Sequence, residues 1–207
     1  EKYQYLEKQE RAFITRVCEG TLEYRLRLDY ILNRYSTVPT EKMKPVIREL
    51  LRSGVYQMLY MDSVPDSAVC NEAVKLARKK GFYNLTGFVN GVLRKVAREY
   101  GSIRFPQKSQ PVEYLSVMYS MPIWLVERFL KDYRFEKSEK IFEAFLEESP
   151  TTIRIREHLV DKQAVLESLE KQKVLVEKAP YVENAYYLKN YDYLPALEAF
   201  RMGNIQV

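Results

Sequence analysis

The chain has 207 residues, of which 46% are hydrophobic and 29% charged, and its formal net charge is +5. This length permits one or two domains with an ordinary hydrophobic core. The sequence contains no apolar run near the roughly 20 residues of a membrane span, no signal-peptide pattern at its polar start, and with seven glycines little material for glycine-rich phosphate loops.

Apolar residues recur at three- and four-residue steps through the first hundred residues, which is the spacing of amphipathic helices. The predicted helices cover residues 10–35 with a possible kink, 41–60, 66–80 and 85–100. Pro45 fits the first turn of the second helix, where its missing N–H is tolerated. Gly81 stands where a left-handed C-cap belongs, and Gly101 closes the fourth helix. Short loops between such helices predict a compact helical bundle.

Residues 104–111 contain two prolines and no periodicity, and they predict a linker. Two further helices are expected at about 112–132, interrupted near Pro122, and at 136–148. Residues 151–156 alternate with a period of two, which predicts a strand. A helix at 161–171 and strands at 174–177, 185–188 and 203–207 complete the pattern of a small ferredoxin-like unit. The expected fold is therefore mainly α, a helical bundle followed by a small α/β subdomain.

Few side chains could carry out a reaction or hold a metal ion. Cys18 and Cys70 each stand alone beside helical apolar patterns, which is typical of buried, reduced thiols and favours the cytoplasm. His158 lies in a charged loop, where we expect it to be solvated. Glu147 and Glu148 are adjacent, so on a helix their carboxylates diverge. We expect no catalytic residue, no metal site and no cofactor within these residues.

The positive charge is concentrated in one stretch. Residues 42–104 carry twelve Lys and Arg against five Asp and Glu, a net charge of +7, whereas residues 105–207 carry fourteen against sixteen. On predicted helices the basic residues form stripes opposite the apolar side. Three stripes on three helices would form one surface for the phosphates of a nucleic acid. They are Arg48 and Arg52 (with Lys44), then Lys75, Arg78 and Lys79, then Arg94, Lys95 and Arg98.

Each stripe also has a plainer interpretation, because any soluble helix places charges opposite its apolar side. Gly87 and Gly91 lie near the arginine edge of the fourth helix, where another helix or an RNA backbone could approach closely. For Asn71 and Asn90 we favour capping or hydrogen bonds inside the bundle over contact with bases. For Trp124 we favour packing over base stacking.

Three blocks in order resemble the NusB-like domain: LRSGVYQMLY at 51–60 followed by Val64-Pro65, NEAVKLA at 71–77, and GFVNGVLR at 87–94. In particular, they resemble the version fused to the RsmB/Sun cytosine-5 methyltransferases of small-subunit ribosomal RNA. MPIWL at 121–125, PTTIRI at 150–155 and FRMGNIQV at 200–207 resemble the part that precedes the catalytic domain of these enzymes. The resemblance implies a NusB-like domain at 1–103 whose N-terminal helix is missing, a linker at 104–111, and a second part at 112–207.

In this family a cysteine thiolate attacks cytosine C6, C5 takes a methyl group from S-adenosylmethionine, and a second cysteine helps to release the product. The family's cysteines follow Pro and Thr, whereas Cys18 and Cys70 both follow Val. The resemblance therefore assigns them no catalytic role, and it implies that the catalytic domain and its cofactor lie outside this chain.

We expect an RNA-binding region that holds ribosomal RNA by phosphate contacts and, through Arg154 and Arg156, passes the target loop to the absent catalytic domain. No membrane or metal partner is expected. One alternative is a transcription antitermination factor of the NusB type, against which the hundred residues after Arg104 argue. The other is a helical protein-binding module whose basic faces are only solvated.

Overall fold

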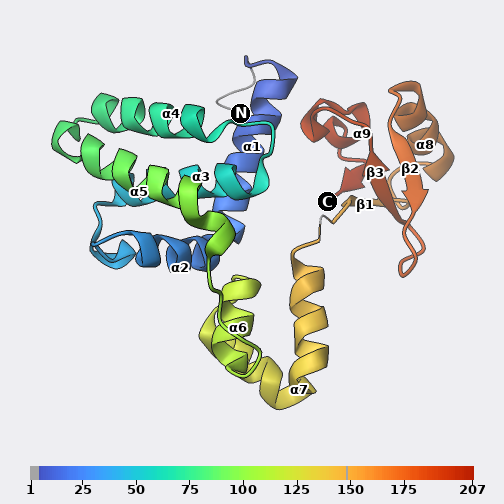
Figure 1. The fold of residues 1–207 in the computed structure, drawn as a ribbon. Coiled ribbons are helices and arrows are strands. Elements are labelled where there is room, and N and C mark those ends of the chain that lie inside the picture. Colours follow the sequence, from blue (N-terminus) through green and yellow to red (C-terminus); the bar gives the residue numbers. More distant parts are fainter. Residues whose placement is uncertain (1–4, 148) are drawn as a thin grey trace. The chain divides into compact units, whose positions relative to one another are not determined.

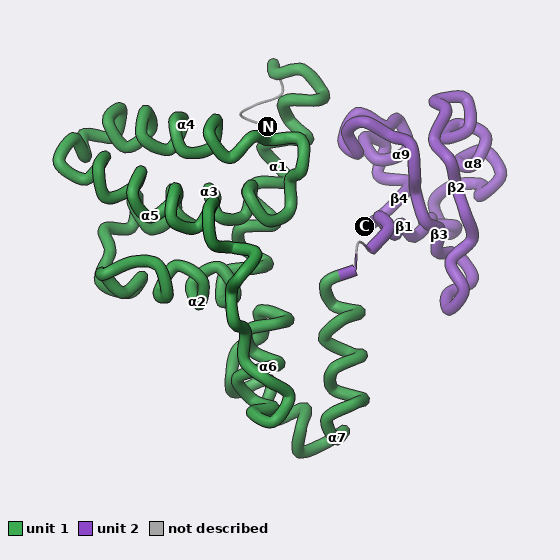
Figure 2. Tube along the Cα trace, in the orientation of Figure 1, with its two compact units in different colours: residues 1–146 green, residues 147–207 purple. Residues whose placement is uncertain are grey.

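The computed structural model describes residues 5–147 and 149–207; residues 1–4 and Glu148, where the predicted 136–148 helix ends, lie outside the described residues. The chain divides into two compact units, one reaching Leu146 and one starting at Glu147 (Figure 2). Hydrophobic residues from 151 onward have a core of their own. The division falls after the predicted linker at 104–111, because α6 (Pro111–Met118) packs against α2 (Arg25–Tyr35) in the first unit.

Four more helices of the first unit are α1 (Lys8–Glu23), α3 (Pro45–Tyr60), α4 (Asp66–Lys79) and α5 (Thr86–Glu99), blue to green in Figure 1. The predicted helix at 10–35 is two helices, α1 and α2, which meet at Tyr24. Pro45 begins α3, and Gly81 after α4 has φ 83°, so both predicted boundary roles are confirmed.

Packing rather than capping holds these helices. The N-termini of α2, α3, α4 and α5, all within the described residues, lack a side-chain cap hydrogen bond. Each instead buries an apolar stripe, and one fully buried Leu or Val contributes roughly 1.5–3 kcal/mol. The fully buried members of this core are Leu28, Ile31 and Leu32 of α2, Leu51 and Val55 of α3, Ala77 of α4, and Val89, Leu93 and Val96 of α5.

Three tyrosines pack where α1 meets α2 and α3. The ring centroids of Tyr24 and Tyr60 are 4.4 Å apart, and those of Tyr56 and Tyr60 are 5.1 Å apart. Gly20 of α1 lies against this cluster, since a Cβ atom at that position would fall 2.0 Å from Cζ of Tyr56. Burial raises the pKa of Tyr60 to about 12. Gly20 therefore sets how closely α1 approaches α3.

Helix α7 (Ile123–Phe145) is broken at Arg134, whose φ of 60° and ψ of 171° are not helical. The rings of Phe129 and Phe142 lie 5.0 Å apart, although thirteen residues of straight helix would separate them by about 20 Å. The two halves of α7 therefore fold back on each other around a core that includes Leu115 of α6. The break predicted between residues 132 and 136 is confirmed.

The second unit has strands β1 (Thr151–Ile155), β2 (Leu175–Lys178), β3 (Ala185–Lys189) and β4 (Ile205–Gln206). All pairings in the sheet are antiparallel and the order is β2-β3-β1-β4. Helix α8 (Lys162–Lys171) links β1 to β2, and the short α9 (Glu198–Arg201) precedes β4. With two adjacent strands joined by a turn between two crossovers, this is the predicted ferredoxin-like arrangement. The predicted fold class is confirmed.

Candidate nucleic-acid interface

Helix α5 carries the clearest basic face. Arg94, Lys95 and Arg98 are exposed, while Val89, Val92, Leu93 and Val96 on the other side are buried. This facing agrees with the 100° rotation per residue used to predict it. The helix thus presents three cationic side chains to solvent, and no carboxylate of the described residues forms an ion pair with them.

The GFVNGVLR segment contributes to this surface more than expected. Nε of Arg94 donates to Oδ1 of Asn90 at 3.0 Å on the exposed side of α5, so Asn90 orients an arginine instead of joining two helices. A Cβ at Gly87 or Gly91 would meet nothing within 4 Å. No other part of the described chain therefore packs against either glycine, and the surface beside Arg94 is accessible to a ligand.

On α4 the predicted residues Lys75, Arg78 and Lys79 are all exposed. Lys75 pairs with Glu72 at 2.7 Å, whereas Arg78 and Lys79 have no ion pair among the described residues. The positive charge of Arg94 acts on Cys70 of α4. Burial raises the pKa of the Cys70 thiol, and the charge of Arg94 offsets part of that rise. Arg78 lies eight residues beyond Cys70, which is about 12 Å along the axis of α4. Arg78 and Lys79 are exposed cations on a helix that packs against α5.

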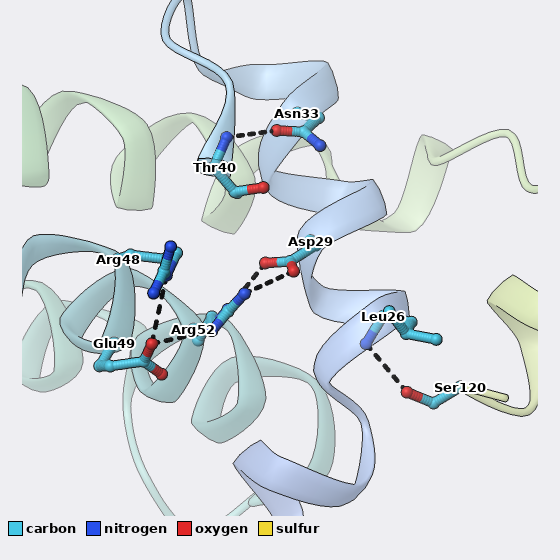
Figure 3. Close-up of polar contacts among 8 residues, drawn as sticks. All are labelled: Leu26, Asp29, Asn33, Thr40, Arg48, Glu49, Arg52 and Ser120. Atoms are coloured by element: carbon cyan, nitrogen blue, oxygen red, sulfur yellow. Dashed lines mark hydrogen bonds and ion pairs between the residues drawn. The ribbon is translucent and has the colours of Figure 1, made fainter. Parts of the chain in front are cut away.

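Arg52 does not belong to this surface. Its Nε and Nη2 atoms donate to the two carboxylate oxygens of Asp29 on α2 at 2.7 and 2.5 Å, and Nη1 donates to Glu49 at 2.8 Å (Figure 3). The residue is only 8% exposed. Burial by itself lowers the pKa of Arg52, but the hydrogen bonds and charges of Asp29 and Glu49 outweigh it and raise the pKa above its usual value. The guanidinium therefore stays charged. It joins α2 to α3 and is unavailable to a phosphate.

Arg48, one turn before Arg52, keeps 27% of its side chain exposed and has a 3.3 Å contact with Glu49 (Figure 3). The same carboxylate therefore serves both arginines. Arg48 remains at the margin of the candidate surface, partly neutralised, in contrast to the unpaired cations of α5.

Aromatic and basic residues of α2 and of the segment after α5 enlarge the α5 face. Tyr30 donates its hydroxyl to the carbonyl of Arg104 at 3.0 Å, and its ring stacks on Phe105 with 5.9 Å between centroids. The guanidinium of Arg34 lies 4.5 Å from the centroid of Tyr30. Nζ of Lys95 lies 5.7 Å from the ring centroid of Tyr35, which is on α2 like Tyr30.

Arg34 and Arg104, both exposed, meet at Tyr30, and Lys95 contacts Tyr35 of the same helix, α2. We call Arg34, Arg94, Lys95, Arg98 and Arg104 the α5 basic face. Nothing in the local pattern pointed to Arg34 and Arg104, because seventy residues separate them and only the packing of α2 on α5 brings them together.

In the second unit, the two predicted arginines lie at the end of β1, Arg154 within the strand and Arg156 directly after its last residue. They line a pocket of about 410 Å³ together with Ile155, His158, Asn184 and Gln206. Nη2 of Arg154 donates to Oε1 of Gln206 at 2.9 Å. His158, expected to be solvated, is exposed but borders this pocket.

The described residues offer little for other chemistry. Across 5–147 and 149–207, no three or more His, Cys, Asp or Glu side chains gather as they would around a metal ion. Cys70 is a buried free thiol as predicted, whereas Cys18 is exposed, so the prediction of burial is wrong for Cys18. None of the described helices combines the length and apolar character that crossing a bilayer requires. Trp124, for which packing was predicted, is 68% exposed. What remains is a surface suited to binding phosphate groups.

Comparison with known proteins places both units. Residues 1–98 match the NusB family, and residues 121–192 match the ferredoxin-like domain described as Methyltr_RsmF/B-like. The chain is 36% identical over 183 residues to the Bacillus subtilis protein named "Probable ribosomal RNA small subunit methyltransferase B", covering 88% of this chain and 40% of that protein. It is 39% identical over 82 residues to the transcription antitermination protein NusB of Kineococcus radiotolerans, covering 39% of this chain and 60% of that one.

The crystal structure of PH0851 has the same fold, with a TM-score of 0.76 and 20% identity over all of this chain and 46% of that one. A second methyltransferase B relative, from Synechocystis, is 30% identical over 77% of this chain and 36% of its own length. The chain thus spans about two fifths of the methyltransferase relatives it matches. With a NusB domain followed by an RsmF/B-like ferredoxin-like domain, it belongs to the ribosomal RNA small subunit methyltransferase B family.

Proposed function

We propose that this chain is the RNA-binding region of an S-adenosylmethionine-dependent ribosomal RNA cytosine-5 methyltransferase of the cytoplasm. It holds small-subunit ribosomal RNA and positions it for a catalytic domain outside these residues. S-adenosylmethionine binds in that domain and supplies the methyl group. The residues of this chain contribute binding and orientation.

The observation that carries the proposal is the α5 basic face. Its arginines and lysine lack carboxylate partners among the described residues, and two of its members, Arg34 and Lys95, lie over tyrosine rings. Cations held in this way lose less rotamer freedom when they meet a phosphate. The face also lies in the unit that matches the NusB family. Arg78 and Lys79 extend the contact along α4.

The test is binding of fragments of small-subunit ribosomal RNA to the 207-residue chain, measured across a range of salt concentrations. Arg94→Glu with Arg98→Glu should weaken binding at least tenfold. It should also lower the slope of log K against log salt by about 0.7–0.9 for each phosphate that the variant no longer neutralises. Both arginines are exposed, so the fold should be retained.

A matched control reverses two exposed lysines of α7, Lys131→Glu with Lys140→Glu, for the same change in net charge. If the control weakens binding as much as the α5 variant, attraction is non-specific and the assignment of the face fails. Absence of binding to any structured RNA at low salt, with tight binding of a protein partner, would favour the protein-binding module. A preference for antitermination-signal RNA over ribosomal RNA would favour the NusB-type factor, whose relatives lend it support through residues 1–98.

A further inference from the structure

The pocket at the end of β1 has the size and donor set of a site for one nucleotide. Its volume of about 410 Å³ lies within the 300–1,000 Å³ typical of small-ligand sites. We propose that it binds a single unstacked nucleotide of single-stranded RNA, with the phosphate on Arg154, Arg156 and His158 and the base edge on Asn184 and Gln206. This inference rests on the RNA-binding role proposed above and names the ligand of the second unit.

The positive charge at this pocket is not neutralised by the described residues. The side chain of Arg154 is bonded to the neutral amide of Gln206. Neither Arg154 nor Arg156 forms an ion pair within the described part of the chain, and the neighbouring Glu157 is paired with Lys162 at 3.8 Å. Two guanidinium groups beside an imidazole therefore present several donors to an anion, and the planar arginine fork matches phosphate oxygens.

The two amides add a donor and an acceptor. Oε1 of Gln206 accepts from Arg154, and its NH₂ group has no hydrogen bond among the described residues, so it can donate to a ligand in the pocket. Nδ2 of Asn184 donates to the carbonyl of Ile155 at 3.3 Å, which leaves its Oδ1 atom as an acceptor. One donor next to one acceptor is the pattern that a base edge requires. A site for inorganic phosphate alone would need neither.

Main-chain hydrogen bonds fix the walls of the pocket. The N–H of Ile155 donates to the carbonyl of Asn184 at 3.0 Å, and the N–H of Arg156 donates to that of Asn204 at 2.9 Å. Arg156 therefore lies on backbone that is already paired, and Arg154 is paired within the sheet with Ala185 of β3 and Gln206 of β4. This pairing lowers the ordering cost of binding. A base inside a duplex is stacked and cannot enter a pocket, so the ligand is a nucleotide from a loop or an open strand.

The chain has a single histidine, so the ring signals of His158 report on the pocket in an NMR spectrum without further assignment. The 207-residue chain would be titrated with cytidine 5′-monophosphate, with cytidine and with inorganic phosphate. We expect the monophosphate to shift the His158 signals with an apparent Kd at least tenfold below that for inorganic phosphate, and cytidine to bind more weakly than the monophosphate. Arg156→Gln should raise the Kd for the monophosphate by about tenfold or more.

Arg201→Gln on α9 is the control, because it removes the same charge from an exposed position of the same unit outside the pocket lining. It should change the Kd less than about twofold. Gln206→Glu, which places a carboxylate beside Arg154, is a second variant that should block the monophosphate. If Arg156→Gln does not fold, the effect of Gln206→Glu on monophosphate binding still tests the pocket assignment.

The pocket assignment is overturned if the monophosphate leaves the His158 signals unmoved, if it binds no tighter than inorganic phosphate, or if Arg201→Gln matches the loss in Arg156→Gln. These outcomes are separable from the proposed function. Ribosomal RNA binding that depends on the α5 basic face, without a response of His158 to the monophosphate, removes the pocket alone. A response to the monophosphate without binding of ribosomal RNA supports the pocket and removes the larger function.

Discussion

Replacing Arg52 by Met should destabilise the helical unit and leave its RNA affinity unchanged. Two of the nitrogens of Arg52 bond both oxygens of Asp29, and a third bonds Glu49 (Figure 3). Met fills a similar volume without charge, so the substitution leaves Asp29 without its arginine. The same change would weaken RNA binding if Arg52 were a phosphate ligand.

The magnitude follows from burial. Removing one partner of a fully buried ion pair costs about 3–5 kcal/mol. The side chains of Arg52 and Asp29 are 10% and 20% exposed, so water recovers part of the loss at Asp29. We expect a loss of about 2–3 kcal/mol in the free energy of unfolding for Arg52→Met. Asp29→Asn, which leaves Arg52 its bond to Glu49, should cost about 1–2 kcal/mol.

Urea unfolding followed by circular dichroism measures these losses, and the double variant gives the coupling between the two residues. RNA affinity is then compared at a urea-free condition in which all variants are folded. A loss below about 0.5 kcal/mol for Arg52→Met, the value of an exposed pair, would refute the structural role. A tenfold weaker affinity for RNA with the fold intact would return Arg52 to the binding surface.

Three further predictions concern stability. Gly20→Ala should cost about 1–3 kcal/mol in urea unfolding, because its Cβ would overlap the ring of Tyr56, and Tyr56→Leu in the same chain should recover part of that loss. Burial raises the pKa of Glu139, but the hydrogen bonds and charge of Lys108 and of neighbouring tyrosines lower it further, to below the usual 4.5. The stability from Glu139 is therefore present above pH 4.5 and lost as the pH falls through its lowered pKa; urea unfolding between about pH 5 and 3 should show a steeper loss in the native chain than in Glu139→Gln, and equal slopes would contradict this. Gly81→Ala, at a φ of 83°, should cost about 1 kcal/mol in a thermal melt, and no change would show that α4 ends differently in solution.

The helices and strands could be predicted because their periodicity is local. The buried valines of α5 and the alternation in β1 are visible in any window of ten residues, and so is the break near Arg134, where the apolar spacing of α7 is interrupted. The extent of the first unit could not be predicted in this way. It depends on α6 packing against α2, a contact between segments some ninety residues apart, such as the bond from the N–H of Leu26 to Ser120 Oγ at 2.9 Å (Figure 3).

The predicted basic stripe on α3 fails at Arg52 for a geometric reason. Steps of four residues look aligned in sequence, but four residues rotate a helix by about 400°, so each step turns the side chain a further 40°. Lys44 precedes α3, and the one full step within the helix, from Arg48 to Arg52, turns the side chain by about 40°, toward α2. Asp29 lies there, twenty-three residues earlier in the chain. A charge pattern in the sequence identifies candidate phosphate-binding residues. Whether a carboxylate neutralises one of these residues depends on the tertiary structure.

The order of strands in the sheet of the second unit has a consequence for synthesis. β1 pairs with β4 across fifty residues, Arg154 with Gln206 and Ile155 with Ile205, whereas the α7 hairpin closes over only thirteen. Local contacts form early and distant ones late. During translation the helical parts can therefore fold while β1 still has an open edge, and that edge stays available to other chains until the last strand leaves the ribosome.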